Sequence, residues 1–129
     1  MTELRFPSLE IVLNFQTRLI ERYGGSPGLR AQEALESALA APQNLHFYEG
    51  ANAIRCAAAY AYHLSQAHAF VDGNKRIAWA IAILFLEMNG IILTVPETEA
   101  EDVCMQIAAS KITRAEVEAH FDRWVTQTV

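Results

Sequence analysis

The longest uninterrupted apolar segment of the chain runs from Ile77 to Leu86. Apolar residues occupy every face of this segment, so the pattern predicts a helix that is surrounded by other helices. The segment is far shorter than the roughly 20 residues that a membrane-spanning helix needs. Asp72 is a favourable N-cap residue and Asn89-Gly90 a favourable stop, so the helix is predicted to begin at Gly73 or Asn74.

Helical periodicity predicts three helices before this central segment. Ser8 is a suitable N-cap for the first, whose apolar residues recur at helical spacing: Ile11, Val12, Phe15, Leu19 and Ile20. The second covers about Ala31 to Ala41 and ends before Pro42, because proline disfavours helical conformation in the residue preceding it. The third covers about Ala51 to Gln66, and its many alanines permit close packing against the central helix.

The remaining segments complete the predicted fold. Pro42 to Gly50 is predicted to be extended, since aliphatic and aromatic residues stand among polar ones. Residues 91–95 form a short apolar connector, and the acidic residues within 97–102 predict the first turn of a fifth helix. Thr113 with Glu116 fits a capping box that begins a sixth. We therefore expect an all-α fold of about six helices around a buried central helix, in a single domain covering residues 1–129.

Composition and charge narrow the classes of function. Apolar residues make up 52% of the 129 residues, which suits a helical core. The net charge of −5, with no basic cluster outside the start of the central helix, disfavours a direct nucleic-acid partner. Cys56 and Cys104 lack metal or redox spacing, so we expect free thiols in a reducing compartment. No basic start followed by an apolar stretch precedes Phe6, so we expect a cytoplasmic protein without a membrane partner.

The segment His68 to Arg76, directly before the apolar run that starts at Ile77, carries the candidate chemistry. A helix start offers unpaired N–H groups at the positive end of its dipole, and Lys75 and Arg76 add charge, so a phosphate is the expected ligand. His68 can transfer protons near neutral pH, and Asp72 can hold a hard divalent cation. Taken singly, each residue has a simpler explanation as a cap, a structural histidine or a solvated charge. Two cations placed against the dipole favour a bound polyanion.

This segment resembles the signature of the Fic/Doc (Fido) superfamily, and the lysine after Asn74 resembles its death-on-curing (Doc) branch. Other segments resemble Doc-type chains in the same order: Arg22-Tyr23-Gly24-Gly25, Pro27-Gly28-Leu29-Arg30, Ala34-Leu35-Glu36-Ser37-Ala38-Leu39 and Phe85-Leu86-Glu87-Met88-Asn89-Gly90. The resemblance implies a Fido fold in which Pro42 to Gly50 is the flap, a short edge that pairs with the target's backbone. An ordinary surface loop is the alternative for that segment.

The resemblance also implies a role for each residue of the motif. His68 is the expected general base, which takes the proton from a hydroxyl of a target protein. Asp72 is expected to hold the Mg²⁺ of a bound ATP. Gly73 and Asn74 are expected to build the anion hole, and Arg76 to grip phosphate. The implied catalytic residues are His68, Asp72, Lys75 and Arg76, the implied nucleotide-binding residues are Gly73, Asn74, Lys75 and Arg76, and the implied metal ligand is Asp72.

Two positions bear on which group is transferred. Most Fic enzymes transfer AMP, whereas Doc is similar to a kinase and phosphorylates a threonine of elongation factor Tu. Lys75 stands where AMP-transferring members have glycine, and Trp79 stands where they carry a second arginine that holds the distal phosphate. Both residues favour a Doc-like toxin that transfers phosphate from ATP to a protein hydroxyl and blocks translation. AMP transfer and an inactive Fido-fold binding module are the alternatives.

The chain lacks the self-inhibitory sequence of many Fic enzymes, which is Ser or Thr, three residues, Glu, then Gly or Asn. Its only Glu-Gly or Glu-Asn pair is Glu49-Gly50, and the residue four positions before Glu49 is Leu45. The resemblance therefore implies restraint by a separate antitoxin, like the disordered tail of Phd that folds onto Doc, in a type II toxin-antitoxin module.

Overall fold

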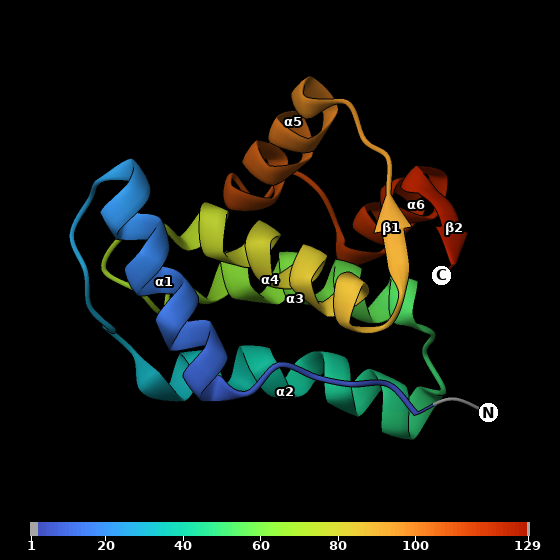
Figure 1. Cartoon of the computed structure of the whole chain (residues 1–129), viewed down its shortest axis with the longest axis horizontal. Helices are drawn as coiled ribbons and strands as arrows, with labels where there is room; N and C mark the ends of the chain where they lie inside the picture. Colours follow the sequence, from blue (N-terminus) through green and yellow to red (C-terminus); the bar gives the residue numbers. More distant parts are fainter. Residues whose placement is uncertain (1–2, 129) are drawn as a thin grey trace.

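The computed structural model of the chain describes residues 3–128, which form six helices and a two-stranded sheet (Figure 1). The elements are α1 (Leu9–Tyr23), α2 (Gln32–Glu49), α3 (Ala53–Ala67), α4 (Asn74–Met88), β1 (Ile91–Leu93), α5 (Glu97–Ala108), α6 (Arg114–Trp124) and β2 (Val125–Thr128). The all-α fold of six helices is confirmed. Within the predicted connector, β1 pairs antiparallel with β2, and Ile91 lies opposite Thr128.

Helices α3 and α4 pack against each other at the centre of the fold, and the other helices surround them (Figure 1). The small residues Ala57 to Ala59 are fully buried in α3, so the two helices approach closely as predicted. Helix α4 buries Ile77, Ile81 and Phe85 completely, which confirms the central helix. No helix within residues 3–128 is long and apolar enough to cross a bilayer.

Local capping signals are also confirmed. The Ser8 hydroxyl accepts a hydrogen bond from the Ile11 N–H and caps α1. At the start of α6, the Thr113 hydroxyl accepts from the Glu116 N–H while the Glu116 carboxylate accepts from the Thr113 N–H. These caps satisfy N–H groups that a helix start leaves without partners, so their sequence signals mark the true helix starts.

The prediction that Pro42 to Gly50 is extended, and that the second helix ends before Pro42, is wrong. Helix α2 continues through Pro42 to Glu49. Its buried residues follow one helical stripe across the proline: Leu35, Ala38, Leu39, Pro42 and Leu45. Burial of this stripe against α3 outweighs the cost of a proline inside a helix. The helix ends only at Gly50, which takes the left-handed conformation.

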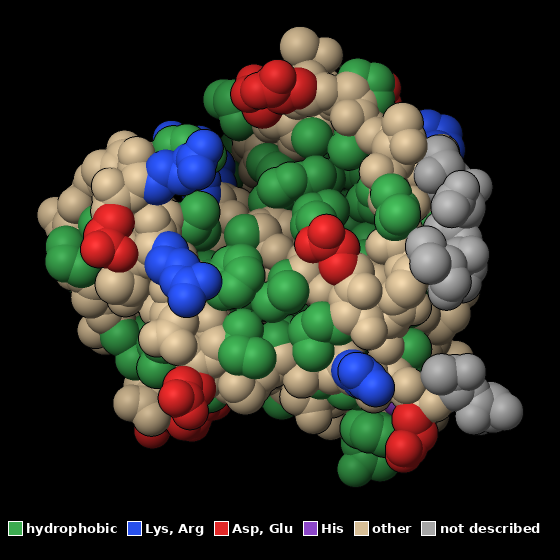
Figure 2. Space-filling view, in the orientation of Figure 1, with side chains coloured by type: hydrophobic (Ala, Val, Ile, Leu, Met, Phe, Trp, Pro, Cys, Tyr) green, Lys and Arg blue, Asp and Glu red, His purple; other side chains and the backbone are tan. Residues whose placement is uncertain are grey.

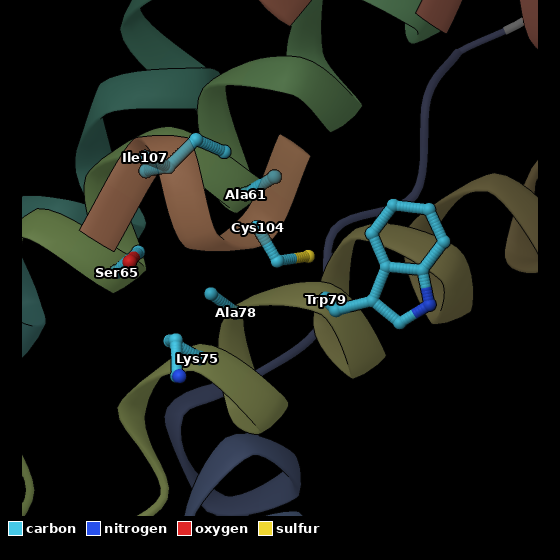
Figure 3. Close-up of a pocket in the computed structure, with 7 residues that line it drawn as sticks. All are labelled: Ala61, Ser65, Lys75, Ala78, Trp79, Cys104 and Ile107. Atoms are coloured by element: carbon cyan, nitrogen blue, oxygen red, sulfur yellow. The ribbon is translucent and has the colours of Figure 1, made fainter. Parts of the chain in front are cut away.

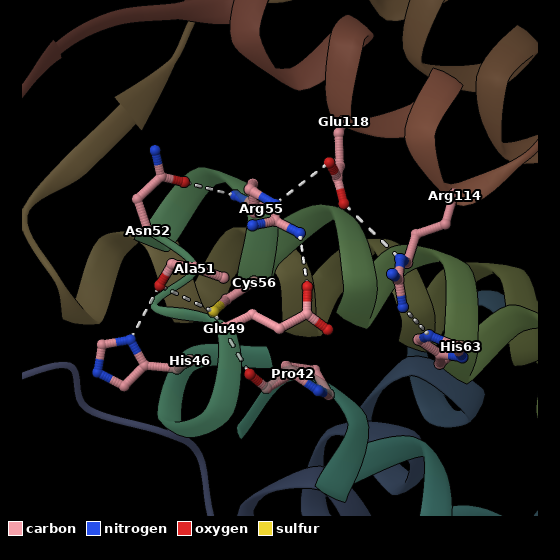
Figure 4. Close-up of polar contacts among 10 residues, drawn as sticks. All are labelled: Pro42, His46, Glu49, Ala51, Asn52, Arg55, Cys56, His63, Arg114 and Glu118. Carbon is pink, nitrogen blue, oxygen red and sulfur yellow. Dashed lines mark hydrogen bonds and ion pairs between the residues drawn. The ribbon is translucent and has the colours of Figure 1, made fainter. Parts of the chain in front are cut away.

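A chain of charged side chains joins α2, α3 and α6 (Figure 4). Arg55 pairs with both Glu49 and Glu118, at 3.4 Å each. Arg114 pairs with Glu118 at 3.7 Å and also contacts the His63 ring nitrogen Nε2 at 3.3 Å. Since arginine only donates hydrogen bonds, His63 must accept with a neutral ring. Burial, reinforced by the Arg114 charge, lowers the pKa of His63.

The lowered pKa of His63 predicts a loss of stability in acid. Below about pH 6.5 the unfolded chain binds a proton at this histidine more readily than the folded chain does. The neutral His63 therefore contributes its full stabilisation above that pH, and this stabilisation is lost as pH falls through the lowered folded-state pKa. The loss is at most about 1.4 kcal/mol per pH unit. The free energy of unfolding can be measured in urea for the wild type and for His63→Gln at pH 7.5 and 5.5. Between these two pH values it should decrease less for the variant than for the wild type. Equal decreases would contradict the assignment.

Candidate active site

The motif forms the connection between α3 and α4 at one end of the central helix pair (Figure 1). His68 ends α3 in the left-handed conformation, with φ 47° and ψ 41°, and its side chain is exposed. Gly73, with φ 78°, is the N-cap of α4, which begins at Asn74 as predicted. The cap residue is therefore Gly73 and not Asp72, and the Asp72 carboxylate remains exposed at the other end of the loop from His68.

Asn74 holds the loop from the side of the core. Its side-chain oxygen accepts from the Phe70 N–H at 3.1 Å, and its side-chain nitrogen donates to the Phe70 carbonyl at 3.0 Å. Phe70 itself is buried. The amide group of Asn74 thus fixes the shape of the loop, and the group that Asn74 offers to an anion is its backbone N–H.

An extended segment before α2 holds the loop from the opposite side. The Val71 N–H donates to the Gly28 carbonyl at 3.0 Å, and the Arg30 N–H donates to the Ala69 carbonyl at 2.7 Å, so that Leu29 and Phe70 form an antiparallel bridge. The Arg30 guanidinium also donates to the His68 carbonyl at 2.9 Å. The extended edge beside the motif is therefore residues 28–30, earlier in the chain than the segment predicted as the flap.

Helix α1 and the residues that follow it form a third wall around Asp72. One oxygen of its carboxylate accepts from the Ser26 N–H at 3.3 Å, and the other accepts from the Gly73 N–H at 2.9 Å. The buried Gln16 donates to the Asp72 carbonyl at 3.4 Å. At Gly25, whose φ is +111°, a Cβ atom would lie 2.6 Å from the Asp72 Oδ2. Only a glycine leaves room for this carboxylate.

Our predictions missed the contacts of Gln16 and Gly25 with Asp72, and the sequence contained a signal only for Gln16. Gln16 falls four positions after the buried Val12, on the apolar face of α1, and a polar residue there needs a specific partner. The Gly24-Gly25 pair indicated only a loop, because nothing local identified the carboxylate that Gly25 accommodates.

The first turn of α4 leaves unpaired the backbone groups that the motif predicts to bind an anion. The backbone N–H groups of Asn74, Lys75 and Arg76 have no acceptor among the described residues, and they lie at the positive end of the helix dipole. The Arg76 guanidinium lies over the ring of Tyr23, 4.5 Å from its centroid. Together these groups can bind a phosphate.

Lys75 is directed to a different side of α4 from Arg76. It lines a narrow cleft whose other residues are Ala61, Ser65, Ala78, Trp79, Cys104 and Ile107 (Figure 3). The cleft is too narrow to admit a water molecule, so it is not a ligand pocket. Burial raises the pKa of the Cys104 thiol to about 11, although the Lys75 charge acts in the opposite direction. Cys104 is thus a protonated free thiol, as is the buried Cys56.

Trp79 is half-buried and packs against the hydrophobic core. Its ring contacts those of Phe121 and Trp124 at centroid distances of 5.9 and 6.0 Å. At this position the chain therefore offers an aromatic contact to α6 and no second guanidinium for phosphate.

The donor set at Asp72 fits a magnesium ion that arrives with a nucleotide. No group of three or more His, Cys, Asp and Glu side chains within residues 3–128 is arranged to hold a metal ion by itself. Each Asp72 oxygen accepts one backbone N–H and keeps further lone pairs free. Mg²⁺ commonly takes one or two carboxylates and completes its shell with water and phosphate oxygens, which matches a single exposed carboxylate beside an anion-binding turn.

Comparison with known proteins shows the family of the chain. A sequence profile described as the Fic/DOC family matches residues 6–86, which include the motif and α1 to α3. The chain is 38% identical over 92 residues to "Toxin Doc" of Mycolicibacterium smegmatis, which covers 67% of this chain and 69% of that protein. It is 33% identical over 89 residues to "Protein kinase doc" of Escherichia phage P1, and this match covers 68% of this chain and 71% of that protein. The chain therefore belongs to the Fic/Doc (Fido) family, in its death-on-curing branch.

Proposed function

We propose that the protein is a Doc-like toxin that transfers the terminal phosphate of ATP to a hydroxyl of a target protein, by resemblance a threonine of elongation factor Tu. One observation carries the proposal: an exposed histidine shares a short, fixed loop with a helix start whose N–H groups and arginine are available to phosphate. The names of the relatives, a toxin and a protein kinase, support the same activity.

The proposed reaction uses the residues of the motif directly. The target hydroxyl oxygen bonds to the terminal phosphorus while the bond from that phosphorus to the ADP oxygen breaks, and the hydroxyl proton passes to His68. The N–H groups of residues 74–76 and the Arg76 guanidinium balance the charge on the phosphate oxygens. Asp72 would hold the Mg²⁺, which neutralises phosphate charge when bound.

The edge at residues 28–30 is suited to hold the target. Because Gly28 and Arg30 make the backbone hydrogen bonds to the motif loop, the N–H and carbonyl of Leu29 point away from it. Neither group has a partner among the described residues. We propose that an extended segment of the target pairs with Leu29 and so brings its hydroxyl to His68, which adjoins the paired Ala69.

The inhibitory partner that we propose is a Phd-like antitoxin. A groove with room of about 270 Å³ runs along α4 and β1, and most of its lining is apolar: Trp79, Ile83, Leu86, Ile91, Ile92, Leu93 and Val95, with Glu87. Figure 2 shows hydrophobic side chains gathered in the hollow between α1, α5 and β1. A disordered segment that folds on binding could bury its own apolar face there.

His68→Ala is expected to lower phosphate transfer at least about 100-fold, because the general base is lost. Incubation of the target with ATP labelled at the gamma phosphate will label it, whereas ATP labelled at the alpha phosphate will not. His46→Ala, at a histidine outside the site, serves as the matched control and should keep its activity. Label retained from the alpha position would establish AMP transfer instead, and unchanged transfer by His68→Ala would exclude His68 as the base.

Gly25→Ala is expected to displace the Asp72 carboxylate, because its Cβ would lie 2.6 Å from Oδ2. The Mg²⁺ concentration for half-maximal transfer should rise roughly tenfold, the scale of losses when a metal ligand is misplaced. Gly24→Ala is the matched control: its φ is also positive, at +84°, but its Cβ would meet no atom within 4 Å. Equal Mg²⁺ requirements in the two variants would show that crowding at Asp72 is unimportant.

Expression of the chain alone is expected to arrest growth, and co-expression of a small neighbouring open reading frame to relieve the arrest. Ile83→Asp should weaken antitoxin binding at least about tenfold, since it places a charge in the apolar groove. Tyr48→Asp, at an exposed residue outside the groove, should leave binding unchanged. Harmless expression together with full nucleotide turnover would contradict the toxin assignment.

A further inference from the structure

Tyr23, the last residue of α1, places its ring against the Arg76 guanidinium. The guanidinium carbon lies 4.5 Å from the ring centroid, which is within the range of a cation–π contact. No carboxylate of the described residues forms an ion pair with Arg76. The guanidinium of Arg22 approaches the same ring at the longer distance of 5.5 Å.

This type of contact has a consequence for a phosphate-binding arginine. A carboxylate partner would occupy the N–H groups of Arg76 and compete with phosphate for them. An aromatic ring contacts the flat face of the guanidinium, so the five N–H donors in its plane stay available. The ring also restricts a long side chain that would otherwise lose rotamer entropy when it binds phosphate.

The position of Tyr23 is coupled to the motif through the end of α1. Gln16 donates to the Asp72 carbonyl, and Ser26, just after the helix, donates to the Asp72 carboxylate. Gly25 lies directly against the same carboxylate. The chain on both sides of Tyr23 is therefore anchored to the loop that carries Asp72, which keeps Tyr23 next to the helix turn that carries Arg76.

We propose that Tyr23 is a positioning residue for the nucleotide phosphate: its ring holds the Arg76 guanidinium in place while leaving every N–H donor free. This inference rests on the proposed function, since it assigns Arg76 to ATP. Tyr23 contributes through the negative face of its ring and not through its hydroxyl. A smaller aliphatic residue would therefore lose the effect, and phenylalanine would keep it.

A fluorinated series at position 23 tests this directly. Phenylalanine, 3,5-difluorophenylalanine and 3,4,5-trifluorophenylalanine have nearly the same shape, but each added fluorine weakens the negative face of the ring. We expect the phenylalanine variant to bind MgATP within twofold of the wild type by calorimetry. The Kd should then rise stepwise with fluorination, by about two- to fivefold over the series. The melting temperature should not follow the same trend.

The same series in an Arg76→Gln background is the matched control. The stepwise trend should disappear there, because the cation that the ring holds is absent. If the Kd for MgATP does not change across the series in the wild-type background, or changes equally in both backgrounds, Tyr23 does not have the proposed role. The proposed function is unaffected by that result as long as the wild type binds MgATP. Absence of MgATP binding by the wild type would overturn the proposed function and this inference together.

Discussion

Helix α4 buries one face in the core but exposes Lys75 and Arg76 in its first turn, and the site depends on this contrast. Ile77, Ile81 and Phe85 are fully buried against the surrounding helices, which fixes the axis of α4. One residue earlier, Arg76 is exposed, and the N–H groups of residues 74–76 have no protein acceptor among the described residues. A rigid helix thus presents a fixed set of donors to solvent, and phosphate binding there requires little rearrangement.

The loop in front of that helix is held from three directions. Asn74 bonds to both backbone groups of Phe70, residues 28–30 pair with residues 69–71, and the end of α1 contacts Asp72. His68 adopts a left-handed conformation that is costly for a residue with a Cβ atom. The surrounding hydrogen bonds maintain that conformation and keep the imidazole exposed. Such support is what a catalytic group needs if its position is to be set before the substrate arrives.

Features governed by local interactions could be predicted from the sequence. The start of α4 and the caps at Ser8 and Thr113 depend on residues close to one another in the chain, and the structure confirms them. The motif residues were identified because they are contiguous.

Features that depend on distant contacts could not be predicted in this way. Helix α2 crosses Pro42 because its apolar stripe is buried against α3, and no local pattern records the strength of that packing. Gly25 and Tyr23 contact Asp72 and Arg76 across a large separation in the chain, and the direction of Lys75 toward Cys104 depends on where α5 packs. The sequence predicted which residues would carry the chemistry, whereas the contacts that hold these residues could be seen only in the fold.

An amide NMR titration tests most directly whether the first turn of α4 binds the triphosphate of ATP. With ¹⁵N-labelled protein and MgATP, the account predicts that the largest shifts fall on Asn74, Lys75 and Arg76, which have free N–H groups at the helix start. Shifts confined to the groove between α4 and β1, or no shifts at millimolar MgATP, would contradict it.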